Sequence, residues 1–514
     1  MLRGEQVDKL IKGVFTLFLF ILCILFFAQK MNFVTADLGR HLVNGKLFCE
    51  EGKVPVTNFY SYTEPKYRTV THHWASGIIF YQLWKIFGFT GLSFVYVLIS
   101  FITFYLFFTI AQRNANFSFA YVCALLVLPL IAYRTDIRPE GFSNLFLGIY
   151  FFLLYRIKKD DLSVKWLYVL PLLQFTWVNL HVFFPLGLFL IFLFGFDAWL
   201  QKKDFRPYVI VFCCAVGSCF INPFGLEGVL TPFTIFKNYG YMVAENQSLL
   251  FMQERMGGPL YIHFQVLCGL VGIGVVMLIV KKEEYRHCLE IILILFFCFF
   301  AWHIVRALPL FGYFFMPIAA HTWHVCAGSY SRKVKKWLPL GMCMMIVILL
   351  IRIVCMQQSY YSPFQGKSGL GLLPGVHRSA QFVKQNNIDG PIFNNYDIGG
   401  YLIFHLFPHI RPFVDNRPEA YSVSFFKEIY IPMQEDEAVW GKMSEKVNFN
   451  CIYFYRYDST PWAQPFLIRR LNDPQWAPVF VDDYTLILIR RNKKNTQLIQ
   501  KYELPKEIFR VRKT

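Results

Sequence analysis

Long apolar runs are the feature that most constrains this chain. A helix that crosses a bilayer needs roughly 20 apolar residues, and the sequence supplies a series of such stretches. Only 16% of the 514 residues are charged, against roughly 25% in soluble globular chains. We therefore predict an α-helical polytopic membrane protein with about eleven spans, at residues 13–31, 89–111, 117–133, 141–155, 166–181, 184–200, 208–221, 261–280, 289–302, 308–327 and 338–356.

The first apolar run resembles a secretory signal at first sight, because Arg3, Lys9 and Lys12 precede it. It has no small-residue cleavage site, and more than a signal's length of lipid-compatible sequence follows it. A cleaved signal combines a short apolar region with such a site. We therefore interpret residues 13–31 as an uncleaved first span.

Basic residues in the short loops predict the orientation of the spans, because Lys and Arg are enriched in cytoplasmic loops. All of the basic loops fall on alternate connections, on the side of the N-terminus: Arg113, 156–159, 202–203, 281–282 and 332–336. We predict that this side is the cytoplasm. An odd number of spans then places the C-terminal region outside, together with the large loops 32–75 and 222–260.

Residues 357–514 are predicted to form an extracytoplasmic α/β domain after a transmembrane domain at residues 1–356. Charges return there, and short segments with helical or strand-like spacing alternate. The helical segments are 379–390 and 398–408, and the strand-like ones are 391–395, 411–415, 450–455 and 484–489. Gly399 and Gly400 could hold an anion at a helix start, but tight packing of helix against strand is the favoured explanation.

Polar and ionisable residues gather at the predicted outer boundary of the membrane, where such groups tend to line a cavity or a substrate path. Arginine offers a planar fork to phosphate oxygens, and a carboxylate can act as general base for an acceptor hydroxyl. We therefore predict a site for an anionic lipid phosphate, with Asp37 as the catalytic residue. The predicted substrate-binding residues are Arg40, His41, His72, His73, Trp74, Arg138, Asn179, His181, Arg306, Asp415 and Arg417.

Several of these residues also have a purely structural explanation. An Asp just beyond a span is most often a solvated helix end, and paired histidines at an interface usually cap or snorkel. Arg138 and Arg306 could anchor at headgroups, and Asp415 and Arg417 could pair with each other. No Cys/His spacing points to zinc, whereas a divalent metal ion bound by Asp37 is left open as a cofactor.

Several stretches, in chain order, resemble GT-C-type membrane glycosyltransferases of bacteria. "ADLGRHLVNGKLFCEEGKVPVTNFYSYTEP" and "THHWASGIIFYQLW" are similar to their first outer loop and interfacial helix, with an Asp-x-Gly-x-His-like stretch, a Gly-x-x-Pro turn and a His-x-Trp. The resemblance continues in "IRPEGFSNLF", "WVNLHVFFPLG", "NPFG", "VRALPLF" and "FNNYDIGGYLIFHLFPHIRPFVDNRPEAY". The superfamily includes polyprenyl-phosphate-sugar mannosyltransferases and aminoarabinose transferases.

The resemblance implies an inverting glycosyltransferase at the outer face of the cell membrane. Such an enzyme takes a sugar from a polyprenyl-phosphate donor and passes it to an envelope lipid, glycan or protein. The acidic residue of the first outer loop is the usual proposed base, and Asp37 occupies that place. Protein O-mannosyltransferases carry an Asp-Glu pair there, whereas Leu38 follows Asp37, so the acceptor and any metal stay open. The implied partners are the lipid-linked donor and membrane lipids, with no nucleic acid.

A non-catalytic transporter or envelope-assembly protein with a glycan-binding outer domain is the alternative. A transporter is expected to carry polar residues deep within its spans and paired half-helices. The predicted spans are nearly free of internal charges. This composition favours the enzyme.

Overall fold

The computed structural model describes residues 2–283, 287–327, 341–349, 351 and 367–509. The basic loop 332–336 and part of the predicted span 338–356 lie outside these residues. The chain divides into two compact units, each assembled from separate stretches. The helical unit comprises Met1–Lys30, Phe89–Pro232 and Val243–Gly371, and the mixed unit comprises Met31–Gly88, Phe233–Met242 and Leu372–Thr514.

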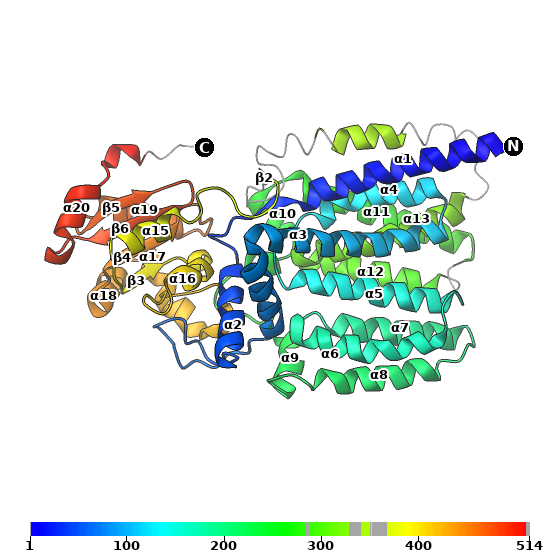
Figure 1. Ribbon diagram of the computed structural model, residues 1–514, viewed down its shortest axis with the longest axis horizontal. Helices are drawn as coiled ribbons and strands as arrows, with labels where there is room; N and C mark the ends of the chain where they lie inside the picture. The colour runs from blue at the N-terminus through cyan, green and yellow to red at the C-terminus, as the bar shows by residue number, and fades with distance from the viewer. Residues whose placement is uncertain (1, 284–286, 328–340, 350, 352–366, 510–514) are drawn as a thin grey trace. The chain divides into compact units, whose positions relative to one another are not determined.

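Apolar helices make up the helical unit, and most coincide with predicted spans (Figure 1). Among the described residues, three helices contain a segment long and apolar enough to cross a membrane, at Gln6–Phe27, Trp74–Asn114 and Pro259–Val280, and four more are shorter and apolar. The chain is therefore a membrane protein, whereas the number of eleven spans stays a prediction. The helices are α1 (Leu2–Phe27), α3 (Trp74–Asn114), α4 (Phe117–Ile131), α5 (Glu140–Lys158), α6 (Leu170–Leu180), α7 (Pro185–Leu200), α8 (Arg206–Cys219), α9 (Leu226–Thr234), α10 (Leu249–Met256), α11 (Pro259–Val280), α12 (Cys288–His303) and α13 (Leu308–Ala327).

Helix α3 is interrupted at Gly88, whose φ is 63° and ψ is −170°. Glycine adopts this backbone conformation without the clash that a Cβ atom would cause. The boundary between the two units falls at the same residue. The predicted span at residues 89–111 therefore begins where the helix resumes.

The mixed unit contains a four-stranded sheet in the order β3-β4-β6-β5. Strand β3 (Ile392–Asn394) runs parallel to β4 (Cys451–Tyr455), and β6 (Thr485–Arg490) is antiparallel to both β4 and β5 (Trp476–Val481). Three of these strands were predicted from apolar runs. Strand β5 was missed, because Pro478 interrupts its apolar pattern and the register shifts between Pro478 and Phe480.

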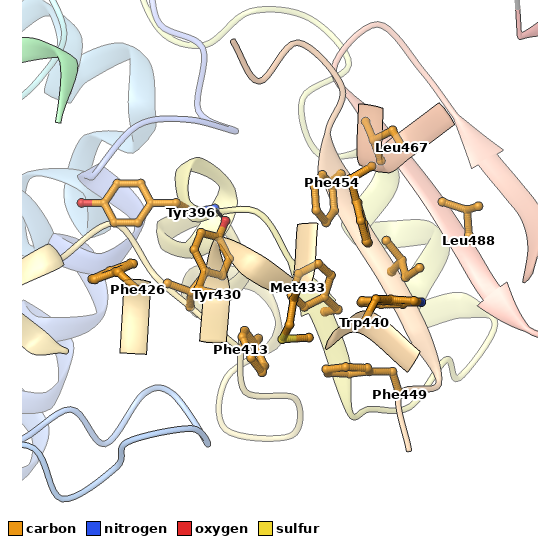
Figure 2. Packing of buried hydrophobic residues seen from close by; sticks show 14 of the residues in the cluster. Tyr396, Phe413, Phe426, Tyr430, Met433, Trp440, Phe449, Phe454, Leu467 and Leu488 are labelled. Carbon is orange, nitrogen blue, oxygen red and sulfur yellow. Dashed lines mark hydrogen bonds between the residues drawn. The ribbon is translucent and has the colours of Figure 1, made fainter. Parts of the chain in front are cut away.

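Aromatic side chains form the core of the mixed unit (Figure 2). Trp440 stacks on Phe449 with ring centroids 5.6 Å apart, and Phe454 stacks on Phe466 at 5.4 Å. Burial of one such side chain contributes about 1.5–3 kcal/mol, so this cluster is a major stabilising element. The helices around it are α15 (Arg378–Gln385), α16 (Gly399–Leu406), η6 (Phe425–Tyr430), α17 (Pro432–Glu435), α18 (Glu437–Val447), α19 (Ala463–Asn472) and α20 (Thr496–Tyr502).

The prediction of a strand at residues 411–415 is wrong, since these residues form a loop. Side chains satisfy their backbone groups in place of a neighbouring strand. The amide of Asn394 accepts from the Phe413 N–H at 2.8 Å and donates to the Val414 carbonyl at 2.7 Å. Phe413 and Val414, the apolar residues of this loop, are nevertheless buried.

The predicted outer loop 32–75 of the transmembrane domain belongs to the mixed unit, which includes Met31–Gly88. The hydroxyls of Ser61 and Thr63 donate to the Phe413 carbonyl at 2.8 and 2.9 Å. Helix α2 (Leu38–Glu51) lies against α16 with almost no space between the backbones, because a Cβ on Gly39 would lie 2.4 Å from the Gly400 carbonyl oxygen. Tight packing at Gly400 is thus what the structure shows.

Candidate functional site

Asp37 is the residue immediately before α2, at its N-cap position. Its carboxylate does not bond the helix N–H groups; instead Oδ1 accepts a hydrogen bond from the side-chain amide of Asn416. Asn416 belongs to the loop that follows α16, and its own Oδ1 is buried without a hydrogen-bond partner. The sequence analysis did not single out Asn416, because nothing local links positions that are 379 residues apart.

The residues on either side of Asn416 lock its loop. The Arg417 guanidinium donates to both oxygens of the Asp415 carboxylate at 2.8 and 2.6 Å, and to Asn58 Oδ1 at 2.7 Å. Burial lowers the pKa of Arg417, but the Asp415 carboxylate more than offsets this and raises the pKa overall. Asp415 and Arg417 therefore pair with each other, and their predicted contact with substrate stays a prediction.

Arg40 lies one helical turn after Asp37, and only 6% of its surface is exposed. Its Nε has no hydrogen-bond partner, and it forms no ion pair among the described residues. Glu419 is close enough for the two charges to interact, yet burial outweighs the effect of Arg40 and raises the pKa of Glu419. Arg40 is thus a buried cation with donor capacity for an anionic or hydroxylated ligand.

Three of the four predicted histidines belong to the mixed unit. The rings of His72 and His73 are 3.8 Å apart between centroids, and those of His41 and His73 are 5.5 Å apart. Trp74, the first residue of α3, packs on Phe48 at 5.1 Å. Within the described residues, no group of three or more His, Cys, Asp or Glu side chains has the geometry for a metal ion.

In the helical unit, Arg138 and Arg306 both contact Glu245. Arg138 Nη1 lies 2.6 Å from one Glu245 oxygen, and Arg306 Nη2 lies 2.5 Å from the other. Arg134, which the sequence analysis did not assign to the site, also contacts Glu245 at 3.0 Å. Both predicted arginines thus belong to one charged cluster. The contacts with Glu245 were not predictable, because 107 residues separate it from Arg138.

Asn179 and His181, at the end of α6, make hydrogen bonds within the helical unit. The Asn179 amide donates to the carbonyls of Phe175 and Ile221, both at 2.9 Å. His181 Nδ1 lies 2.7 Å from Ser143 Oγ. The Asn179 amide thus satisfies two backbone carbonyls, and a role of Asn179 and His181 in substrate binding stays a prediction.

No family model matches the chain, and no curated protein matches it by sequence. Solved structures do match. The archaeal oligosaccharyltransferase AglB from Archaeoglobus fulgidus, in complex with an inhibitory peptide and a dolichol-phosphate, aligns with a TM-score of 0.60 at 10% identity, covering 93% of this chain and 74% of AglB. The apo structure of ArnT from Cupriavidus metallidurans aligns with a TM-score of 0.51 at 11% identity, covering 94% of this chain and 98% of ArnT. The chain has the GT-C fold.

The GT-C fold confirms the resemblance that the sequence motifs indicated. A second oligosaccharyltransferase structure from Archaeoglobus fulgidus, tethered with an acceptor peptide containing the NVT sequon, gives a TM-score of 0.59 at 10% identity, over 95% of this chain and 75% of that chain. At identities this low, a structural match establishes the fold only, and the reaction has to be argued from the chemistry of the site.

Proposed function

We propose that this GT-C protein is a membrane glycosyltransferase that transfers a sugar from a polyprenyl-phosphate donor to an envelope lipid, glycan or protein. The observation that carries the proposal is the setting of Asp37, at the start of α2 and held by Asn416. In this proposal the N-terminus is cytoplasmic, and the mixed unit and its Asp37 face the outer side of the membrane.

Asp37 supplies the base in the proposed reaction. Its carboxylate takes the proton of the acceptor hydroxyl while the hydroxyl oxygen attacks C1 of the sugar. The bond between C1 and the phosphate oxygen breaks, and polyprenyl phosphate leaves with both bonding electrons. A single displacement of this kind inverts the configuration at C1.

Further polar side chains assist the reaction in this proposal. Asn416 fixes one carboxylate oxygen of Asp37 and thereby its orientation. Arg40, a buried cation one turn further along α2, stabilises negative charge near the acceptor. Arg138 and Arg306 bind the donor phosphate, because guanidinium groups pair with phosphate oxygens at two points.

The test uses the purified full-length protein in nanodiscs with a panel of polyprenyl-phosphate sugars and envelope acceptors. Mass spectrometry follows released polyprenyl phosphate and glycosylated product. Asp37→Asn keeps the shape of the side chain but removes its charge, so we expect turnover to fall by about a hundredfold or more. Glu51→Gln, at the exposed end of the same helix, is the matched control and should keep the parent rate.

Two outcomes would contradict the proposal in different ways. Parent-like turnover by Asp37→Asn would place the base elsewhere, with Asp136 the next residue to substitute. Absence of turnover with every donor, from a protein that is folded and binds glycans, would favour the non-catalytic alternative.

A further inference from the structure

Three arginines of the helical unit converge on one carboxylate. Arg134 and Arg306 donate to Glu245 Oε2 at 3.0 and 2.5 Å, and Arg138 donates to Oε1 at 2.6 Å. The side chains are largely buried, with exposures of 12%, 14% and 12% for Arg134, Arg306 and Arg138, and 19% for Glu245. Burial raises the pKa of Glu245, but the three arginines outweigh it and hold the pKa well below the usual range.

The two glutamates of this cluster differ in how the chain holds them. Glu140 is the first residue of α5, and its carboxylate contacts Arg134 at 2.8 Å and Arg306 at 3.1 Å. Glu245 instead belongs to the three-residue turn η2 (Ala244–Asn246) within the long outer loop. Glu140 is therefore a built-in partner of the arginines, whereas Glu245 is brought to them by a loop.

The arginines have more donors than the carboxylates use. Arg306 Nε is buried and makes no hydrogen bond, although a Glu140 oxygen lies nearby. The arginines also border a small cavity of about 10 Å³, whose lining includes the polar side chains of Asp136 and Asn144 and the apolar side chains of Phe183 and Leu310. A phosphate group offers more acceptor oxygens than a carboxylate, and so would use donors that Glu245 leaves idle.

Charge balance points in the same direction. The three guanidinium groups face the carboxylates of Glu140, Glu245 and Asp136, the last of which lies 3.9 Å from Arg138. With Glu245 withdrawn, the cluster keeps one net positive charge. The phosphodiester of a polyprenyl-phosphate sugar carries one negative charge, so it restores the balance that Glu245 provides.

We propose that Arg134, Arg138 and Arg306 form an anion site for a lipid-linked phosphate, and that Glu245 occupies this site as an internal substitute until the phosphate displaces it. The inference rests on the proposed function for the identity of the lipid, and adds to it Arg134 as a ligand and Glu245 as a competitor. Entry of the phosphate is thereby coupled to release of the η2 turn.

Substitution of the competitor gives the first test. Farnesyl phosphate serves as a short probe, and its dissociation constant is measured on the full chain in phosphatidylcholine nanodiscs. Glu245→Gln removes the competing charge, so we expect the dissociation constant to fall about tenfold, equivalent to about 1.4 kcal/mol. Arg134→Gln should raise it about tenfold. Glu254→Gln, an exposed acid of the same outer loop, is the matched control and should bind like the parent.

Hydrogen exchange of the unsubstituted protein gives a second test that does not depend on a variant folding. Saturating farnesyl phosphate should speed exchange at residues 243–248, because Glu245 loses its arginines. Unchanged or slower exchange there would overturn the proposal, as would equal affinity of Glu245→Gln and the parent for farnesyl phosphate.

Further probes identify the source of the phosphate and separate the two proposals. Farnesol should not bind at the site, and inorganic phosphate should bind weakly. If phosphatidylglycerol nanodiscs produce the same exchange response, the site takes a bulk lipid headgroup and the donor assignment is overturned. If farnesyl phosphate binds to none of the proteins, the polyprenyl-phosphate donor of the proposed function fails as well. If it binds to all of them equally, the roles of Arg134 and Glu245 both fail, while the donor of the proposed function stands.

Discussion

Removal of the Asp415 carboxylate should unfold the mixed unit before it affects any ligand. Asp415 is fully buried, and Arg417 is 4% exposed. In Asp415→Ala, Arg417 loses both charge-assisted hydrogen bonds and keeps the contact with Asn58 at 2.7 Å and the Tyr60 ring at 5.2 Å. A buried charge left without its partner costs about 3–5 kcal/mol. This is a large part of the roughly 5–15 kcal/mol that stabilises a typical domain.

Pulse proteolysis of the full chain in urea measures this loss, through fragments that arise from cleavage within residues 378–502. We expect the urea midpoint of Asp415→Ala to drop by the equivalent of 3–5 kcal/mol, and an Asp415→Leu/Arg417→Met double variant to recover most of it, because an apolar pair leaves no buried charge. Asp389→Ala breaks an exposed ion pair with Lys494 and should cost less than about 1 kcal/mol. A stable Asp415→Ala protein that has lost affinity for donor or acceptor would refute this reasoning and make Asp415 a ligand-binding residue.

Two further predictions concern the acid stability of the mixed unit and the membrane orientation. Burial lowers the pKa of His405 to about 3, whereas the unfolded chain binds this proton near pH 6.5; stability is therefore complete above pH 6.5 and falls with acidification, by about 2 kcal/mol at pH 5. Hydrogen exchange at α15 and α16 between pH 7.5 and 5 measures this loss of stability. If the stability of His405→Gln falls with pH as steeply as that of the parent, groups other than His405 cause the loss. Reporter fusions at Lys159 and Lys203 should be active in the cytoplasm and fusions after residue 356 outside, and cytoplasmic activity of the latter would reverse the proposed orientation.

Local sequence patterns predicted those elements whose formation depends on local chemistry. Lipid excludes unpaired backbone groups, so continuous apolar sequence marks the helices closely: the predicted spans 117–133 and 184–200 correspond to Phe117–Ile131 and Pro185–Leu200. The segment 411–415 shows the limit of such patterns. Its apolar residues Phe413 and Val414 are buried, but the amide of Asn394 provides the hydrogen bonds that a strand would have needed.

The sequence predicted which types of residue belong to the candidate site, but not which residues contact one another there. The sequence pointed to Asp37, Arg138 and Arg306, because ionisable groups at a membrane boundary are costly and tend to line a cavity or a substrate path. It gave no access to Asn416 beside Asp37, or to the way in which Glu245 gathers three arginines. Those contacts join residues more than 60 positions apart, and only tertiary packing brings them together.

The assembly of the mixed unit from distant stretches has a consequence for biosynthesis. Ser61 and its partner Phe413 are 352 residues apart, and at roughly 5–20 residues per second a ribosome takes about 20–70 s to make the chain between them. During that time α2 has been made, but the glycine-lined face of α16 against which it packs has not. The nascent first loop must therefore be shielded until the last third of the protein emerges. For the same reason, residues 372–514 expressed alone would expose the surface that α2 normally covers.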